Sequence, residues 1–304
     1  MIYTFGCSMT KWYWPTWADW LQVYDQPVTN LSYPGYGNTN TYWNILNQIN
    51  KLNPGDHVIV AWTQNHRLAQ WYDREWIEEK DCLGFFPDTD GRLWFTEDEP
   101  YKGLYRTHPS YQTSYTNMLV DQLQTMLHTQ WLLEKIGCKF TMVTMSSIWW
   151  DGRPVYKPTF RHMWHTVNGA SQKDNRIAES LIKLEPIRKL LNLINWSTYA
   201  NGPDDPTDPE QYSGIWEYYI NNREYKKLKH ETDNHPVSLA HHDFALEVIL
   251  KKDPKKGKYR NVAREISEDA MTMYIPEFSP TDFVASPETK LLDNKYKTIL
   301  EELN

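Results

Sequence analysis

Four short segments of the chain carry side chains suited to acyl-transfer chemistry. Ser8 stands after an apolar run and a glycine, and its hydroxyl is a candidate nucleophile. His235 is the candidate base, and Asp233 precedes it by two residues, a spacing that turns both side chains the same way in an extended segment. Gly35 and Asn65 are candidate donors to an oxyanion, through a backbone N–H and a side-chain amide. These residues predict a triad of Ser8, Asp233 and His235, with an oxyanion site formed by Ser8, Gly35 and Asn65.

Two of these assignments have competitors. Cys7 adjoins Ser8 and is a second candidate nucleophile, but side chains alternate at the end of a strand, so we expect Cys7 to be buried. Glu231 is an alternative acid for His235, and a backbone carbonyl is a third partner that the ring can use. The residue types alone leave these alternatives open.

Signatures of metals and cofactors are weak. The paired histidines have no Cys or carboxylate at ligand spacing, so we expect surface or packing roles for them. They are His162, His165, His241 and His242. The cysteines Cys7, Cys82 and Cys138 fit neither a metal spacing nor a disulfide framework. Because the Gly35-Tyr36-Gly37 turn also lacks the lysine of a phosphate loop, we predict no metal and no cofactor.

The candidate residues follow segments that are typical of strands. Short apolar runs predict buried strands over residues 2–5, 28–31, 58–62 and 139–145. Helical spacing of apolar residues predicts helices that begin near residues 16, 38 and 115, and others over 177–194 (interrupted near Pro186), 238–250 and 290–303. This alternation indicates a parallel sheet with helices on both faces. Such sheets bind ligands outside the carboxyl ends of their strands, where Ser8, Gly35 and Asn65 stand.

The rest of the chain is divided around this core. We predict one α/β domain over residues 1–251, with two large insertions at about 68–110 and 146–230. Hydrophobic periodicity is lost in the first insertion, which indicates a surface segment. Residues 252–304 are charged and interrupted by prolines, and they predict a C-terminal extension that is a candidate surface for a protein partner.

Charge and hydropathy restrict the partners. The formal net charge is −7, so the overall field does not attract polyanions and nucleic acid is not an expected partner. We interpret the basic run between Lys251 and Arg260 as a solvated linker. No apolar run reaches the roughly 18 residues of a membrane span, and the first residues carry no signal-peptide pattern. We therefore expect a soluble protein that lacks a cleaved signal peptide and does not enter a membrane.

Aromatic residues are abundant, with 15 Trp and 20 Tyr. Their flat apolar faces and polar tips suit sugar rings and protein interfaces. One hypothesis is an aromatic cleft for a glycan, and the alternative is that the same rings pack the insertions against the core. The residues concerned are Trp12, Trp14, Trp17, Trp71, Trp76, Trp94, Trp149, Trp150 and Trp164.

The four segments together resemble the sequence blocks of the SGNH hydrolase superfamily, also called GDSL esterases. Residues 6–10, Gly-Cys-Ser-Met-Thr, are similar to the Gly-Asp-Ser-x-Thr block, and residues 30–35 are similar to the block that ends on an oxyanion glycine. Residues 63–66 match the Gly-x-Asn-Asp block at Asn65, and residues 233–236 resemble the block that holds the histidine. The resemblance covers about half the chain.

The chain departs from the family pattern at three places. Cys7 replaces the usual aspartate, and Thr63 and His66 replace the glycine and aspartate of the third block. Asp233 stands two residues before the histidine, whereas the family usually has its acid three before, where this chain has Thr232. The acid and the third block are therefore the parts that the resemblance specifies least.

The resemblance implies a three-layer α/β/α, flavodoxin-like fold with a five-stranded parallel sheet. It implies a serine esterase or deacylase without a cofactor, and the aromatic residues favour an O-acylated carbohydrate as its ester substrate. The alternatives are an O-acyltransferase, or a non-catalytic structural or glycan-binding protein on the same scaffold. The Gly-Cys-Ser start also resembles bacteriophage-borne members, which implies a cytoplasmic or virion-associated protein.

Overall fold

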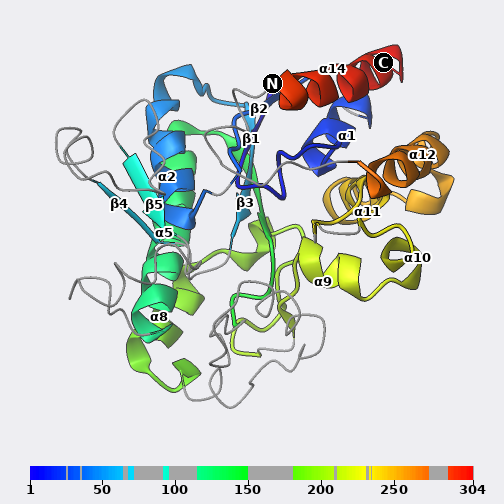
Figure 1. Ribbon diagram of the computed structural model, residues 1–304. Helices are drawn as coiled ribbons and strands as arrows, with labels where there is room; N and C mark the ends of the chain where they lie inside the picture. Colours follow the sequence, from blue (N-terminus) through cyan, green and yellow to red (C-terminus); the bar gives the residue numbers. More distant parts are fainter. Residues whose placement is uncertain are drawn as a thin grey trace, which may run out of the picture.

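The architecture is α/β, with a parallel sheet at its centre and helices packed against it (Figure 1). The computed structural model describes residues 1–24, 27–34, 36–63, 68–71, 92–95, 115–149, 181–208, 211–230, 233, 235–273 and 287–303. Among the predicted site residues, Ser8, Asp233 and His235 fall within this part of the chain, and Gly35 and Asn65 lie outside it.

Four parallel strands form the central sheet. They are β1 (Ile2–Phe5), β2 (Val28–Asn30), β3 (His57–Trp62) and β6 (Lys139–Thr144). The order across the sheet is β2–β1–β3–β6. Ile2 pairs with Val28 on one side and His57 on the other, and His57 pairs with Lys139. Because all four strands run the same way, their carboxyl ends lie at one edge, as the sequence predicts.

From Val58 to Trp62, strand β3 is buried on both faces because its sequence is a continuous apolar run. Ile59 and Ala61 belong to the core on one face of the sheet. Val58, Val60 and Trp62 belong to the core on the other face. This alternation divides the interior into two apolar cores, one on each side of the sheet.

Helices cover both faces (Figure 1). The first core is closed by α1 (Trp17–Tyr24), α9 (Ile215–Ile220), α11 (Ser238–Phe244) and α12 (Arg260–Met271). The second is closed by α2 (Asn38–Asn47), α5 (Tyr115–Ile136) and α8 (Glu185–Leu193). Shorter helices are α10 (Arg223–Lys226) and the turns Ile49–Lys51, Trp196–Thr198 and Pro254–Lys256. The π-helical segment Ala245–Ile249 continues α11, so this helix spans nearly the predicted range.

Turn residues set several helix boundaries. Helix α5 ends where Gly137 adopts a φ of 83°, a left-handed conformation that glycine adopts without a steric penalty. Helix α8 has Pro186 in its first turn, where the missing N–H costs no hydrogen bond. The interruption predicted near this proline is present, because a turn at residues 183–184 precedes α8.

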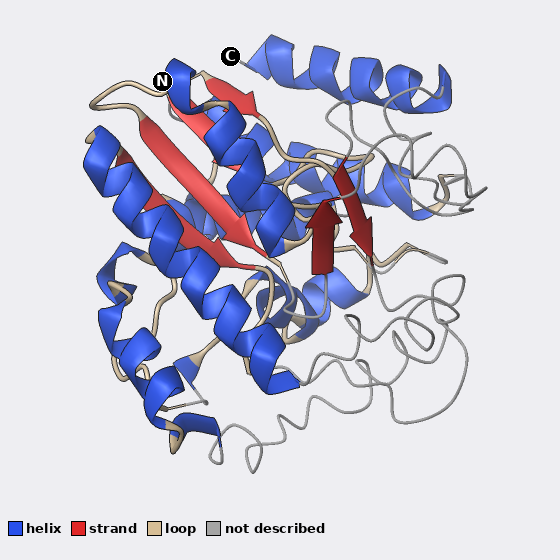
Figure 2. Cartoon of the chain, turned by 90° about the vertical axis from the view of Figure 1, so that its left-hand side faces the viewer, coloured by secondary structure: helices blue, strands red, loops and turns tan. Residues whose placement is uncertain are grey.

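Two features differ from the sequence-based expectation. Beside β6, the described chain forms a single parallel bridge between Met142 and Tyr199 in place of a fifth strand. Pairing is limited to one bridge because the helical turn Trp196–Thr198 precedes Tyr199 and a further turn follows it. The first insertion, where no pattern was evident, contains an antiparallel pair of strands, β4 (Leu68–Trp71) and β5 (Arg92–Phe95), separate from the parallel sheet (Figure 2).

The C-terminal segment packs on the domain. Ala263, Ile266 and Ala270 of α12 are buried in the first core, and Tyr296 of α14 (Pro287–Leu303) is buried with them. Figure 1 shows α12 beside α11 and α14 beside α1. The basic run is predicted to be a solvated linker, but its last residue is not solvated in this way. The Arg260 guanidinium pairs with Asp243 and Glu224.

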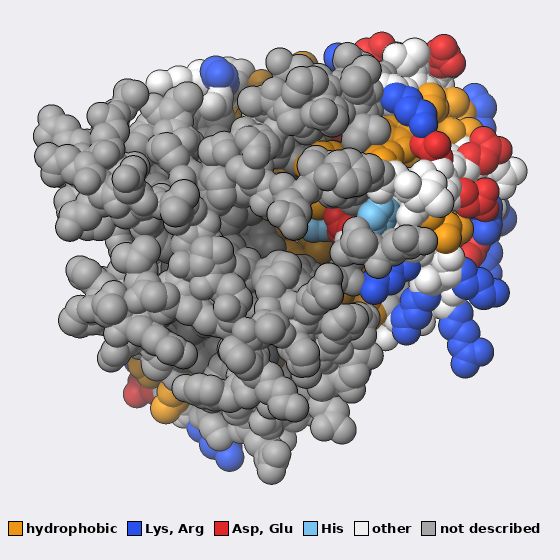
Figure 3. Space-filling model, in the orientation of Figure 1, with side chains coloured by type: hydrophobic (Ala, Val, Ile, Leu, Met, Phe, Trp, Pro, Cys, Tyr) orange, Lys and Arg blue, Asp and Glu red, His pale blue; other side chains and the backbone are white. Residues whose placement is uncertain are grey.

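The surface over α10, α12 and α14 carries acidic and basic side chains interspersed, as Figure 3 shows. None of the helices in the described part of the chain combines the length and apolar character needed to cross a bilayer.

Candidate active site

Ser8 lies in a tight turn at the carboxyl end of β1. The carbonyl of Cys7 accepts hydrogen bonds from the backbone N–H groups of Thr10 (2.9 Å) and Lys11 (3.2 Å). Gly6 precedes the turn at a position with no room for a side chain, since a Cβ there would lie 2.4 Å from Thr10 Oγ1 and 3.0 Å from the Cβ of Ala61. Glycine at this position therefore lets the chain turn sharply and places Ser8 at the sheet edge.

His235 and Asp233 complete a hydrogen-bonded chain with Ser8. His235 Nε2 lies 2.8 Å from Ser8 Oγ, although the two residues are 227 positions apart. His235 Nδ1 lies 2.7 Å from Asp233 Oδ1. A carboxylate only accepts, so Nδ1 carries the proton and the lone pair of Nε2 faces the serine hydroxyl. The structure thus brings together the three predicted residues in the order nucleophile, base and acid.

Although acid and base are two residues apart in the chain, one oxygen of Asp233 reaches two groups of His235. Asp233 Oδ1 also accepts the backbone N–H of His235 at 2.6 Å. One carboxylate oxygen therefore fixes both the backbone and the ring of His235. The alternative acid, Glu231, lies outside the described residues.

Trp12 contacts both the acid and the base, which sequence reasoning did not foresee. Its ring stacks on the His235 imidazole, with centroids 3.6 Å apart and planes 23° apart. Its indole N–H donates to Asp233 Oδ2 at 3.1 Å. The sequence predicts a glycan contact or a packing role for Trp12, and nothing in it relates this residue to an aspartate 221 residues away. With this bond, both oxygens of the carboxylate have donors.

Hydrogen bonds between distant segments hold the site together. The Trp14 indole donates to the carbonyl of Pro236 (2.8 Å), and the Ser238 hydroxyl donates to the carbonyl of Pro15 (3.0 Å). Trp20 of α1 donates to the Ser238 hydroxyl in turn (3.1 Å). The segment after Ser8 is therefore attached to the segment after His235 along its length.

The surroundings of Asp233 favour its ionised form. Burial acts to raise the pKa of Asp233, but electrostatic attraction to the His235 ring and hydrogen bonds from that ring and from the His235 backbone N–H hold this pKa below the ordinary value of 3.8. His241, in α11, is fully buried, and this desolvation together with the nearby His235 lowers its pKa to about 3. His241 is therefore neutral at physiological pH and adds no charge beside the triad.

The loops that lead to the predicted oxyanion donors are connected to each other and to the Ser8 turn. Asn38 and Thr63 exchange two hydrogen bonds, from the Asn38 amide to the Thr63 carbonyl (3.1 Å) and from the Thr63 N–H to Asn38 Oδ1 (2.8 Å). The N–H of Tyr33 donates to the carbonyl of Gly6 at 3.1 Å. Hydrogen bonds thus connect the segments that follow β1, β2 and β3 at the carboxyl edge of the sheet.

The competing candidates pack in the interior. Cys7 is 1% exposed, as predicted, and its sulfur lies 4.0 Å from that of Met145. His242 is buried and lies between Tyr24 (2.8 Å) and Asp243 (2.7 Å), which is a packing role. Three of the residues considered above for a metal or a disulfide, His162, His165 and Cys82, lie outside the described residues.

Four tryptophans of the cleft hypothesis have described side chains, and all four contribute to the core. Trp12, Trp14, Trp17 and Trp149 are all buried. This favours the packing interpretation over an open aromatic cleft for these four rings. The others in the hypothesis lie outside the described side chains: Trp71, Trp76, Trp94, Trp150 and Trp164.

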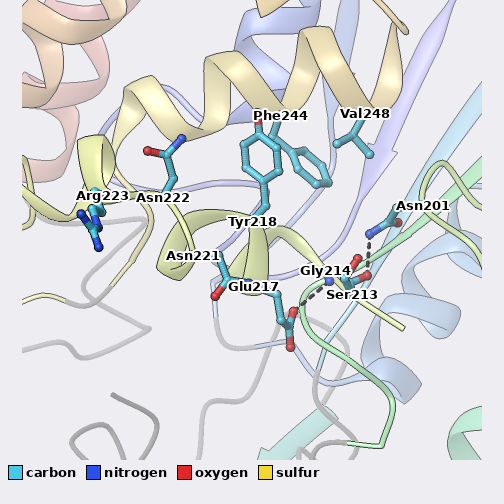
Figure 4. Close-up of a pocket in the computed structure, with 10 residues that line it drawn as sticks. All are labelled: Asn201, Ser213, Gly214, Glu217, Tyr218, Asn221, Asn222, Arg223, Phe244 and Val248. Carbon is cyan, nitrogen blue, oxygen red and sulfur yellow. Dashed lines mark hydrogen bonds between the residues drawn. The ribbon is translucent and has the colours of Figure 1, made fainter. Parts of the chain in front are cut away.

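A separate pocket of about 500 Å³ lies between α9 and the helix that begins with α11 (Figure 4). Two of its polar side chains, Glu217 and Tyr218, already have structural partners. Glu217 accepts the N–H groups of Gly214 and Ser147, and Tyr218 donates to Glu247. No triad residue lines this pocket, so we assign no chemistry to it.

Comparisons with known proteins add no family to this geometry. No family model matches the chain, and no curated protein does.

Proposed function

We propose that the protein is a serine ester hydrolase of the SGNH type, with Ser8 as nucleophile, His235 as general base and Asp233 as the orienting acid. The hydrogen-bonded chain from Ser8 Oγ through both His235 nitrogens to Asp233 Oδ1 carries the proposal. Its geometry matches the requirement that a base lie within hydrogen-bond reach of the nucleophile and that a third group orient the base.

In the proposed reaction, the Ser8 hydroxyl gives its proton to His235 Nε2 as its oxygen attacks the carbonyl carbon of an ester. The negative charge on the carbonyl oxygen is stabilised by the N–H of Ser8, the N–H of Gly35 and the side chain of Asn65. One such donor lowers the barrier by roughly 3 kcal/mol. The protonated His235 then gives its proton to the leaving alcohol, and the acyl group remains on Ser8.

Water completes the cycle under this proposal. His235 takes a proton from the water as its oxygen attacks the acyl carbon, and Ser8 leaves with that proton. An O-acylated carbohydrate is the substrate class that we favour, and an acceptor sugar hydroxyl in place of water would make the same site an O-acyltransferase. We further propose that the fold is the three-layer arrangement of this family, in which the segment at Tyr199 stands in the place of the fifth strand.

One observation favours a second candidate. Ser8 is only 3% exposed, which suits a scaffold that has retained the residues of the triad without turnover. A non-catalytic structural or glycan-binding protein is therefore the alternative.

Ester turnover separates the two candidates. Wild-type protein should release p-nitrophenol from p-nitrophenyl acetate, and the Ser8→Ala variant should lose this activity. The Cys7→Ala variant is the matched control and should stay active, because its thiol packs in the core. Activity that survives Ser8→Ala would rule out the proposed nucleophile, and the absence of turnover in the wild type would favour the alternative.

A further inference from the structure

A second histidine, His230, contacts the backbone of the acid. His230 is 4% exposed and is three residues before Asp233 in the chain. The backbone N–H of Asp233 lies 3.0 Å from His230 Nδ1. His230 Nε2 lies 2.6 Å from the carbonyl oxygen of Met273, just after α12. His230 therefore bridges the acid loop and the C-terminal segment.

These two contacts determine which nitrogen carries the proton. A backbone N–H can only donate, so His230 Nδ1 must be the unprotonated, accepting nitrogen. A backbone carbonyl can only accept, so Nε2 must carry the proton. Both bonds are made together only by the neutral Nε2–H tautomer.

Aromatic packing holds this ring in place. The Trp14 ring stacks near His230, with centroids 6.2 Å apart and planes 30° apart. The Trp14 indole also donates to the carbonyl of Pro236, which follows His235. Trp12 and Trp14, two residues apart, thus pack against the two histidines on either side of Asp233.

We propose that His230 is a positioning residue for Asp233, and that its bond to the Met273 carbonyl holds the ring in the tautomer that accepts from Asp233. This inference rests on the proposed function. The His230 ring fixes the backbone of Asp233, Asp233 Oδ1 fixes the ring and backbone of His235, and His235 faces Ser8. A shift of Asp233 would therefore misplace the base.

Two variants separate the two contacts of His230. In His230→Asn, the amide oxygen can take the place of Nδ1 and accept from Asp233, while the reach to Met273 is lost. In His230→Gln, the amide nitrogen can take the place of Nε2 and donate to Met273, while the acceptor for Asp233 is lost. A positioning role predicts that kcat of the Asn variant stays within a few-fold of wild type. It predicts that kcat of the Gln variant falls about 100-fold with KM little changed, the order of loss for a misplacement of 1 Å.

If His230 served only to hold the segment at Met273, kcat of the Asn variant would fall below that of the Gln variant, and this order would overturn the inference. Equal activity of the two variants would also overturn it. The Ser8→Ala variant run beside them separates this failure from that of the proposed function. If the wild type shows no Ser8-dependent turnover, both proposals fall. If it does, and the Gln variant is as active as the Asn variant, only the role of His230 falls.

A measurement on the unmodified protein does not depend on the variants folding. Proton–nitrogen correlation spectra of the ¹⁵N-labelled histidine rings distinguish the tautomers. The inference predicts that His230, assigned as the signal lost in His230→Phe, is neutral with its proton on Nε2. A proton on Nδ1 would overturn the inference, since that nitrogen could not then accept from Asp233.

Discussion

At the residue scale, the candidate site is organised around one carboxylate. Asp233 Oδ1 accepts from the ring and backbone of His235, and Asp233 Oδ2 accepts from Trp12. The acid has no freedom to rotate without losing one of these bonds. Trp12 therefore acts on the base twice, directly by stacking and indirectly through the acid.

Replacing the indole tests this double contact. Trp12→Phe keeps an aromatic face over His235 and removes the donor to Asp233 Oδ2. A hydrogen bond to a charged group contributes roughly 1.5–3 kcal/mol, so kcat/KM for ester hydrolysis should fall about 10- to 150-fold. Trp131→Phe is the matched control and should be neutral, because Trp131 is 48% exposed on α5. Wild-type kinetics in Trp12→Phe would contradict a role for the indole N–H.

The lowered pKa of Asp233 predicts a pH-dependent contribution to stability. Between the lower pKa of the folded state and the ordinary value of 3.8, the unfolded chain binds more protons. The contribution is therefore complete above the ordinary pKa and is lost as the pH falls through the folded-state value. Urea unfolding should show wild type more stable than Asp233→Asn at about pH 6, with the difference shrinking toward about pH 3. A difference that does not change with pH would contradict an ionised Asp233.

At the element scale, strand ends explain which predictions from sequence held. The run from Val58 to Trp62 is apolar throughout, so a buried central strand and the edge where it ends follow from composition alone. Ser8 was predicted at that edge for the same reason. The indole of Trp12 and the ring of His230 were missed because their partners are determined by how α11 and α12 pack, which no local pattern encodes. The pair β4 and β5 was missed because neither strand alternates clearly between apolar and polar residues.

The turn between β1 and Ser8 predicts a coupled pair of mutations. In Gly6→Ala, the new Cβ would meet Thr10 Oγ1 at 2.4 Å, so the free energy of unfolding should fall by about 1–3 kcal/mol. Thr10→Ala removes that oxygen, which has no hydrogen-bond partner among the described residues, and should cost little alone. The double variant should recover part of the loss, because the contact with Ala61 remains. Additive losses in a double-mutant cycle would contradict this account of the turn.

At the scale of the whole molecule, helices α12 and α14 of the C-terminal segment are packed on the α/β domain. The charged sequence of this segment predicts a C-terminal extension. Sequence alone does not show that Arg260 pairs with the buried Asp243. Ala263 and Ile266 are buried in the first core, and the carbonyl of Met273 contacts the His230 ring. The described part of this segment therefore packs in the same core as α11, the helix that follows His235.

Truncation tests this attachment. A chain that ends after Leu250 loses the apolar side chains of α12 and leaves the Asp243 carboxylate without Arg260, and breaking a buried ion pair costs about 3–5 kcal/mol. It should lose its cooperative thermal transition. A chain that ends after Met273 keeps α12 and should retain that transition. Cooperative unfolding and full activity of the shorter chain would show that the segment is dispensable.

The most direct test of the central claim is covalent labelling of the nucleophile. The wild-type protein would be treated with a fluorophosphonate, and the labelled residue and the rate would be measured by peptide mass spectrometry. We predict one label per chain, on Ser8, and a loss of most of the rate in His235→Ala. A protein that stays unlabelled, or that carries the label elsewhere when Ser8 is intact, would contradict a serine activated by His235.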